Sequence, residues 1–134
     1  MTDQPRVPPD VVARVGAICL GLPEVVEEAA WAGVRWVVAG KNFAHVVRIE
    51  HGRPAAYAQA AGTPGPATVL TLRLPPARLD LPRFARAPFF RPVWFPNIVG
   101  LAVDATTDWD DVAELVTDSY ATLAPKRLVA RLDR

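Results

Sequence analysis

Two runs of β-branched and aromatic residues, 34–39 and 43–50, dominate the hydrophobic pattern of the N-terminal half of the chain. Gly40 and Lys41 stand between them, and two residues between two such runs predict a β-hairpin with a two-residue turn. Gly40 supplies the positive φ that such a turn requires. Because two strands alone are marginal in water, we expect this hairpin to belong to a larger sheet backed by helices.

Alternation along the second run places four side chains on one face of the sheet and leaves the intervening residues to the other face. The four are Phe43, His45, Val47 and Ile49. Each strand carries one strongly apolar face, which predicts helices on one side of the sheet. Three later segments also have strand character: a weak one at 55–59, a clear one at 69–74 and a last one at 98–104.

Helical periodicity predicts a helix near each end of the chain. The first begins with Asp10 as its N-cap and ends before Pro23, and the second begins with Thr107 as its cap and ends at Pro125. Shorter helical segments are predicted at 24–30 and 77–86. The fold class is therefore α+β with two layers: an antiparallel sheet packed by the N-terminal helix and the long C-terminal helix. We expect residues 10–134 to form a single domain and residues 1–9, which are polar and rich in proline, to form a flexible tail.

Composition narrows the class of protein. A chain of 134 residues with a net charge of +1 creates no global field that would demand a membrane or a nucleic acid. The single cysteine, Cys19, excludes an intrachain disulfide and a thiolate zinc site, and its place on the apolar stripe of the first helix predicts a buried core residue. No apolar run reaches the roughly 20 residues needed to span a bilayer, and the N-terminus does not resemble a signal peptide. We expect a cytoplasmic protein.

Catalytic and cofactor motifs are absent from the sequence. It contains no GxSxG, GxGxxG or Walker A pattern, and its only serine, Ser119, lies in a predicted helix. The two histidines, His45 and His51, are separated by a strand's length of about 20 Å and cannot chelate one ion without a bend. His45 is expected to be a hydrogen-bonded histidine on the sheet rather than a ligand or base. The sequence therefore predicts no enzyme, no cofactor and no metal site.

An uneven distribution of charge marks the middle of the chain. Between residues 51 and 103 there are six arginines but one acid, Asp80, and aromatic residues interleave with the second half of this block. Guanidinium groups beside exposed aromatic rings are typical of single-stranded nucleic acid sites, whereas such aromatics more often fill a core. The candidate nucleic-acid-binding residues are Lys41, Arg73, Arg86, Arg91 and Trp94.

A run of six carboxylates between residues 104 and 118 is the acidic counterpart of this block. On a helical wheel Asp111, Glu114 and Asp118 lie opposite the apolar positions, which is typical of a solvated helix face. Without a nearby histidine, such a face offers at most weak binding of hard cations.

Several short motifs resemble the MmcQ/YjbR family. They are Gly21-Leu22-Pro23-Glu24-Val25, Trp31, Gly40-Lys41-x-Phe43-Ala44, and the closing run from Trp109-Asp110-Asp111-Val112 to Ala124-Pro125-Lys126-Arg127-Leu128. The resemblance covers roughly residues 10–130. It implies a frataxin-like (CyaY-like, double-wing) fold and the DNA-binding activity, without catalysis, that is proposed for the family. Many members carry a basic segment just before the last strand, whereas 91–97 here keeps one arginine and one asparagine and has become apolar.

Two alternatives to DNA binding rest on the aromatic stretch 84–96. In the first, this stretch lines a pocket or groove against the sheet and the protein binds a small molecule or a protein partner. In the second, the stretch is the interface of a homodimer, because tryptophan, phenylalanine and arginine are enriched at interfaces. Exposure separates these alternatives: outward aromatics with a basic rim favour nucleic acid or a partner, and a concave apolar cavity favours a ligand.

Overall fold

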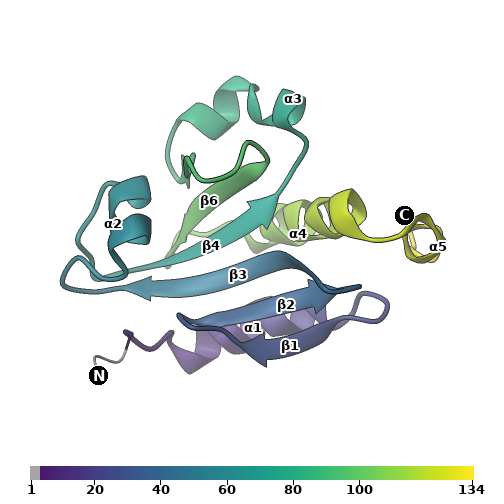
Figure 1. Cartoon of the computed structure of the whole chain (residues 1–134), viewed down its shortest axis with the longest axis horizontal. Helices are drawn as coiled ribbons and strands as arrows, with labels where there is room; N and C mark the ends of the chain where they lie inside the picture. The colour runs from purple at the N-terminus through teal and green to yellow at the C-terminus, as the bar shows by residue number, and fades with distance from the viewer. Residues whose placement is uncertain (1–3) are drawn as a thin grey trace.

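An antiparallel sheet with helices on both faces makes up the computed structural model, which describes residues 4–134 (Figure 1). Within that range six strands form one sheet in the order β1-β2-β3-β4-β6-β5, and every neighbouring pair is antiparallel. The strands are β1 (Val26–Ala29), β2 (Val34–Val38), β3 (Lys41–Ile49), β4 (Ala67–Arg73), β5 (Phe89–Phe90) and β6 (Ile98–Val103). The predicted α+β class is confirmed.

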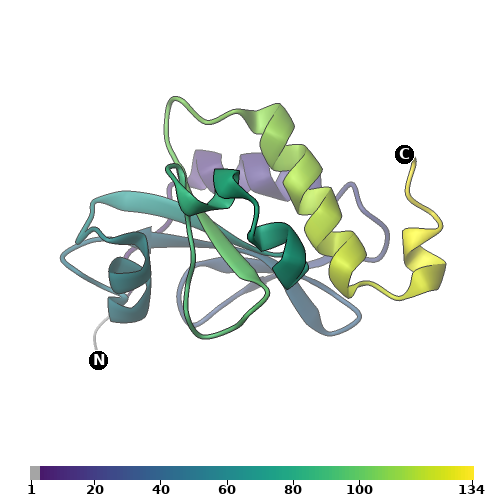
Figure 2. The ribbon, with the colours of Figure 1, turned by 90° about the horizontal axis from the view of Figure 1, so that it is seen from above.

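The helices divide between the two faces of the sheet (Figure 2). Two long ones, α1 and α4, pack on one face, and the short α2 covers one end of the opposite face, against β3. In the described residues the helices are α1 (Pro9–Cys19), α2 (Ala55–Ala61), α3 (Pro76–Leu79), the 3-10 helix η1 (Pro82–Ala85), α4 (Trp109–Leu123) and α5 (Lys126–Val129). The prediction of helices on one side only is therefore incomplete.

The main hydrophobic core lies between the sheet and the α1–α4 layer. Its largest side chains are Trp36, Phe43 and Tyr120, all fully buried. The rings of Phe43 and Tyr120 meet edge to face with centroids 5.5 Å apart, and the Tyr120 hydroxyl donates to the carbonyl of Pro23 at 2.7 Å. A smaller cluster around Val47 fills the space beneath α2 on the other face. Apolar burial of this kind is the main source of stability in a domain of this size.

The central hairpin forms as predicted, but its turn lies one residue earlier. β2 ends at Val38 and β3 begins at Lys41, so the two turn residues are Ala39 and Gly40, with φ of 49° and 76°. Positive φ at both positions is the conformation of a type I′ turn, which matches the twist of the flanking strands. Alanine is a poor residue for the first position because its Cβ disfavours the left-handed region.

A β-bulge overturns the predicted face of Phe43. The register of β2 and β3 shifts between Trp36, which pairs with Ala44, and Val37, which pairs with Asn42, so that Phe43 has no partner on β2. The extra residue turns Phe43 toward α4, whereas His45 stays on the α2 side of the sheet. A bulge changes the side-chain alternation, and period-two counting cannot detect it.

The bulge also interrupts the pairing of β3 with β4, and a serine from α4 fills the gap. The regular β3–β4 register ends at Ala44 and Leu72, and the next pair would be Phe43 and Arg73. The hydroxyl of Ser119 accepts from the backbone N–H of Arg73 at 2.7 Å and donates to the carbonyl of Phe43 at 2.5 Å. Ser119 therefore replaces the direct backbone hydrogen bond and ties α4 to both strands.

Two elements differ in type from the prediction. Residues 24–30, predicted as a helical turn, contain strand β1, because pairing with β2 gives the two glutamates of β1 partners on the neighbouring strand. Glu27 accepts from Trp36 Nε1 at 2.9 Å, and Glu28 accepts from Arg35 Nε at 2.6 Å. The predicted weak strand at 55–59 is helix α2, whose composition, AAYAQAA, has high helix propensity. Gly62 ends α2 in the left-handed conformation.

The predicted helix at 77–86 is divided in two. Proline cannot occupy a helix interior, so Pro82 instead begins η1 after α3 has ended at Leu79. The cap of α4 is Asp108 rather than Thr107, and its carboxylate accepts from the N–H groups of Asp110 and Asp111.

The N-terminal boundary also differs. Residues 1–3 of the predicted tail lie outside the described residues, whereas Val7 packs against the core. Helix α1 begins at Pro9 with Pro8 as its N-cap, and Asp10 lies in the first turn without capping it. Contact with the domain thus begins before the predicted boundary at residue 10.

Candidate functional site

The five residues predicted to bind nucleic acid do not form one surface. Lys41 is exposed beside the hairpin turn, and Arg86 is exposed after η1. Arg91 donates to the carbonyls of Leu79 at 3.0 Å and Pro96 at 3.4 Å, so it holds its own loop in place. Only Arg73 and Trp94 meet, in a pocket on the α2 side of the sheet.

Two of the six arginines of the basic block pair with the acidic face of α4. Arg78 contacts Asp118 at 2.6 Å, and Arg83 contacts Asp111 at 2.5 Å. Asp118 is also paired with Arg134, at 2.7 Å. Burial alone would raise the pKa of Asp118, but Arg78 and Arg134 hold this pKa below its ordinary value. The predicted solvated face of α4 is therefore partly an ion-paired seam that attaches α3 and η1 to the helix.

The aromatic stretch 84–96 also divides by role. Phe84 is fully buried, and its ring lies 5.0 Å from that of Phe89 in the main core. Phe90 lies on the opposite face against Gly100, where any side chain would collide with its ring. Trp94 and Phe95 line the pocket that contains Arg73. The first half of the stretch is therefore part of the core, and the second half covers a pocket whose lining is mostly polar rather than apolar as predicted.

We call this cavity the Arg73 pocket. Its volume is about 90 Å³, and it lies where β3, β4 and β6 meet α2 and the loop before β6. Its polar lining consists of Asn42, His45, Tyr57, Thr71 and Arg73, and its aromatic cover consists of Trp94 and Phe95. A volume of this size accommodates the head group of a small molecule, whereas whole drug-sized ligands occupy roughly 300–1,000 Å³.

The guanidinium of Arg73 is the dominant charge of the pocket. It lies 4.2 Å from the centre of the Phe95 ring and donates to Asn97 Oδ1 at 2.8 Å. No carboxylate in residues 4–134 lies within ion-pair distance of it. Burial lowers the pKa of Arg73, but arginine remains protonated at any physiological pH. The pocket therefore holds a half-buried positive charge that no acid of the described chain neutralises.

A histidine and a tyrosine form the opposite wall. His45 Nε2 lies 2.6 Å from the carbonyl oxygen of Ala32, and the Tyr57 hydroxyl lies 3.2 Å from His45 Nδ1. Burial lowers the pKa of His45, with a smaller contribution from Arg35, so the imidazole is neutral at pH 7. The ring of Tyr57 also packs 5.2 Å from that of Trp94, which links α2 to the aromatic cover. The prediction of a hydrogen-bonded histidine on the sheet is confirmed.

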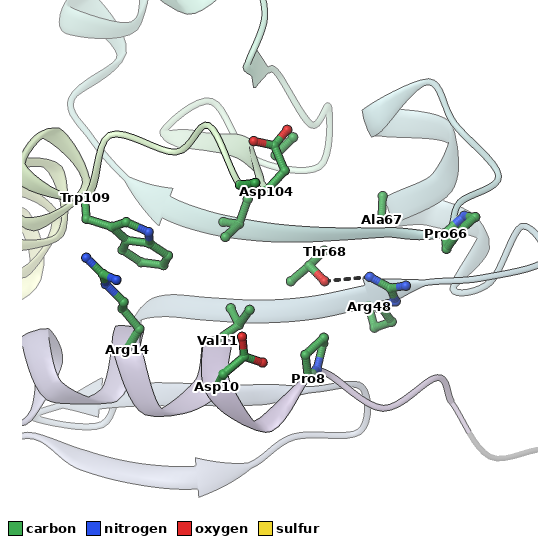
Figure 3. A pocket seen from close by; sticks show the side chains of 13 residues that line it. Pro8, Asp10, Val11, Arg14, Arg48, Pro66, Ala67, Thr68, Asp104 and Trp109 are labelled. Atoms are coloured by element: carbon green, nitrogen blue, oxygen red, sulfur yellow. Dashed lines mark hydrogen bonds between the residues drawn. The ribbon is translucent and has the colours of Figure 1, made fainter.

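A larger groove of about 570 Å³ lies on the other side of the sheet, between the start of α1 and the end of β6 (Figure 3). Arg14 lies over the ring of Trp109 at 4.8 Å, and Arg48 donates to Thr68 Oγ1 at 3.0 Å. Arg48 is also paired with Glu50 at 3.2 Å. The buried charge of this groove is thus already neutralised, which makes it a weaker candidate than the Arg73 pocket.

The remaining candidate residues, Cys19 and His51, form no reactive or metal-binding arrangement with other described residues. Cys19 is fully buried and burial raises the pKa of its thiol, as predicted for a core cysteine. His51 is exposed in the turn after β3. The part of the chain that the structure describes holds no group of three or more His, Cys, Asp or Glu residues arranged to bind a metal, and no helix there is long and apolar enough to cross a membrane.

Sequence reasoning named Arg73 and Trp94 but missed Tyr57 and Thr71. Tyr57 reaches the pocket only because α2 is a helix, whereas the sequence predicts a strand for this segment. Thr71 lies beside His45 through the β3–β4 register, which the sequence does not determine. The one available signal was Tyr57 itself, a lone aromatic residue in an alanine-rich segment.

Comparison with known proteins places the chain in a family. A crystal structure of a protein from Pseudomonas syringae, determined by a structural genomics consortium, resembles it with a TM-score of 0.58 and 13% sequence identity, over 75% of this chain and 87% of that one. At that identity the likeness shows the fold alone. No curated protein matches the chain. The YjbR family model matches residues 20–122, from the end of α1 almost to the end of α4, and the chain therefore belongs to the YjbR family.

Proposed function

We propose that this protein is a non-enzymatic binding module for a small carboxylate-bearing molecule, held in the Arg73 pocket. The observation that carries the proposal is the charge of Arg73, which is half-buried without an acidic partner in residues 4–134. A buried charge is costly unless it is paired, so a carboxylate that enters the pocket gains a charge-assisted, bidentate contact. The proposal follows the ligand-binding alternative for stretch 84–96.

The rim of the pocket suits an apolar substituent on the ligand. Phe95 is 46% exposed, and Val93, two residues earlier on the same loop, is 95% exposed. A ligand whose carboxylate fills the 90 Å³ pocket would therefore extend its apolar part over this loop. Aromatic carboxylates such as phenylacetate fit this description and make convenient probes.

Binding without catalysis is supported by the contacts of His45. Both ring nitrogens have partners, Ala32 at Nε2 and Tyr57 at Nδ1, so neither is free to take a proton from a ligand. The buried Cys19 thiol lies in the core, away from this face of the sheet.

Isothermal titration calorimetry with phenylacetate tests the proposal. Arg73→Met keeps much of the side-chain length and removes the charge, and we expect it to weaken binding by at least about tenfold, since hydrogen bonds to charged groups contribute about 1.5–3 kcal/mol. Arg53→Met is the matched control, because Arg53 is exposed and has no ion-pair partner in residues 4–134. Equal affinity of the wild type and Arg73→Met, or no binding by the wild type, contradicts the proposal.

Nucleic-acid binding is the second candidate function. Lys41, Arg53 and Arg86 are exposed cations without acidic partners in the described residues, and such groups contact phosphates. Fluorescence anisotropy with single- and double-stranded oligonucleotides, repeated at increasing salt, tests it: log K that falls linearly with log salt supports a phosphate-contacting surface. Absence of binding at low salt excludes this function. The frataxin-like architecture implied by the family resemblance stays a prediction alongside it.

A further inference from the structure

The positions of the protons in the Arg73 pocket follow from the hydrogen bonds of His45. A backbone carbonyl only accepts, so the 2.6 Å contact with Ala32 requires the proton of the neutral imidazole to be on Nε2. His45 Nδ1 is then an acceptor, and the Tyr57 hydroxyl, 3.2 Å away, must donate to it. The phenolic oxygen is left with lone pairs alone.

The hydroxyl of Thr71 also uses its proton within the protein and keeps only lone pairs for a ligand. Its hydroxyl donates to the backbone carbonyl of His45 at 3.4 Å, and the side chain is nearly fully buried. Both hydroxyl groups that line the pocket therefore direct their protons to His45. Toward a ligand, Tyr57 and Thr71 offer only hydrogen-bond acceptors, beside the donors of Arg73.

We propose that the ligand of the Arg73 pocket is an α-hydroxycarboxylate, whose carboxylate binds Arg73 and whose hydroxyl donates to Tyr57 Oη or Thr71 Oγ1. This inference rests on the proposed function and adds the second recognition element of the ligand. A plain carboxylate offers no donor to these two acceptors, whereas an α-hydroxyl adds one hydrogen bond to whichever of them it reaches. A neutral hydroxyl donates to these acceptors without placing a second cation near the Arg73 guanidinium, as an ammonium group would.

The size of the pocket agrees with this assignment. Its 90 Å³ is well below the roughly 300–1,000 Å³ of sites for drug-sized ligands, which limits the occupant to a small polar head such as a carboxylate with one adjacent hydroxyl carbon. Larger polar heads, such as a nucleotide, exceed this volume several times over.

Mandelate and phenylacetate are the test pair, since they share the ring and the carboxylate and differ by the α-hydroxyl. We expect one enantiomer of mandelate to bind the wild-type protein about three- to tenfold more tightly than phenylacetate, the range given by one net hydrogen bond. Isothermal titration calorimetry measures both constants. Glycolate and acetate repeat the comparison without the ring.

Variants of Tyr57 and Thr71 test which of these residues binds the α-hydroxyl of the ligand. Tyr57→Phe and Thr71→Val each remove one acceptor, and at least one of them should reduce the ratio of the two affinities to about one while phenylacetate still binds. Thr122→Val, on the exposed side of α4, is the control and should keep the wild-type ratio.

The outcomes separate the two claims. Equal affinities of the wild type for mandelate and phenylacetate, with both abolished by Arg73→Met, overturn the hydroxyl inference and leave the carboxylate site intact. Binding of both ligands that is indifferent to Arg73→Met overturns the proposed function and this inference together. The comparison of ligands on the wild-type protein decides the matter even if a variant fails to fold.

Discussion

Ser119→Ala is expected to be one of the most destabilising single-atom changes in this chain. The Ser119 hydroxyl is fully buried and bridges the Arg73 N–H, at 2.7 Å, to the Phe43 carbonyl, at 2.5 Å. Removing its oxygen leaves one backbone donor and one backbone acceptor without partners. The two strands cannot simply close to bond directly, because the Phe43 bulge and the packing of its ring against Tyr120 hold them apart.

The magnitude follows from the number of groups left unpaired. Each buried polar group without a partner costs about 1–3 kcal/mol, so two predict a loss of about 2–6 kcal/mol in the free energy of unfolding. Domains of this class have about 5–15 kcal/mol in total, so the variant should lose a large fraction of its stability.

Urea denaturation monitored by circular dichroism measures the loss. Thr122→Ala is the matched control, since Thr122 lies on the same helix and its hydroxyl donates to the Asp118 carbonyl at an exposed position. We expect the control to stay within about 0.5 kcal/mol of the wild type. A loss below about 0.5 kcal/mol for Ser119→Ala as well would refute the idea that this hydroxyl completes the β3–β4 ladder.

Two further predictions concern the hairpin turn and the buried histidine. Ala39→Asn should stabilise the protein by about 1 kcal/mol, because Ala39 has a φ of 49° and Asn-Gly is a preferred pair for a type I′ turn; a lower urea midpoint would contradict this. Burial lowers the folded-state pKa of His45 below its ordinary value of 6.5, so the unfolded chain binds the proton more readily and the free energy of unfolding should fall as pH drops below about 6.5. His45→Gln should lose less stability than the wild type between about pH 7.5 and about pH 5, and an equal loss in both proteins would show that His45 does not contribute.

The sequence predicted elements whose signals are local. The stripe of α1, the long pattern of α4 and the two runs around Gly40 depend on periodicity, and each corresponds to an element of the structure. The types predicted for β1 and α2 are wrong for different reasons. β1 depends on the partners that β2 provides for Glu27 and Glu28, whereas α2 follows a helix propensity that the strand interpretation of 55–59 overlooked.

In the candidate site, too, single residues could be recognised from the sequence, whereas the contacts between them could not. Arg73 and Trp94 could be singled out by residue type, but their meeting depends on the path of the loop before β6. The pairing of Arg78 and Arg83 with α4, which neutralises two of the six cations of the basic block, joins residues 40 and 28 positions apart. Such long-range contacts leave no periodic signal in a single sequence.

A ¹⁵N–¹H correlation spectrum recorded during titration with phenylacetate tests the central claim most directly. If the Arg73 pocket binds carboxylates, the largest shifts will fall on the backbone amides of Asn42 and Thr71 and on the indole N–H of Trp94, which line it. The Arg73→Met protein will then need at least about tenfold more phenylacetate to reach the same shifts. Shifts that cluster instead around Trp109 and Arg14, in the groove of Figure 3, or no shifts at all, would contradict the account.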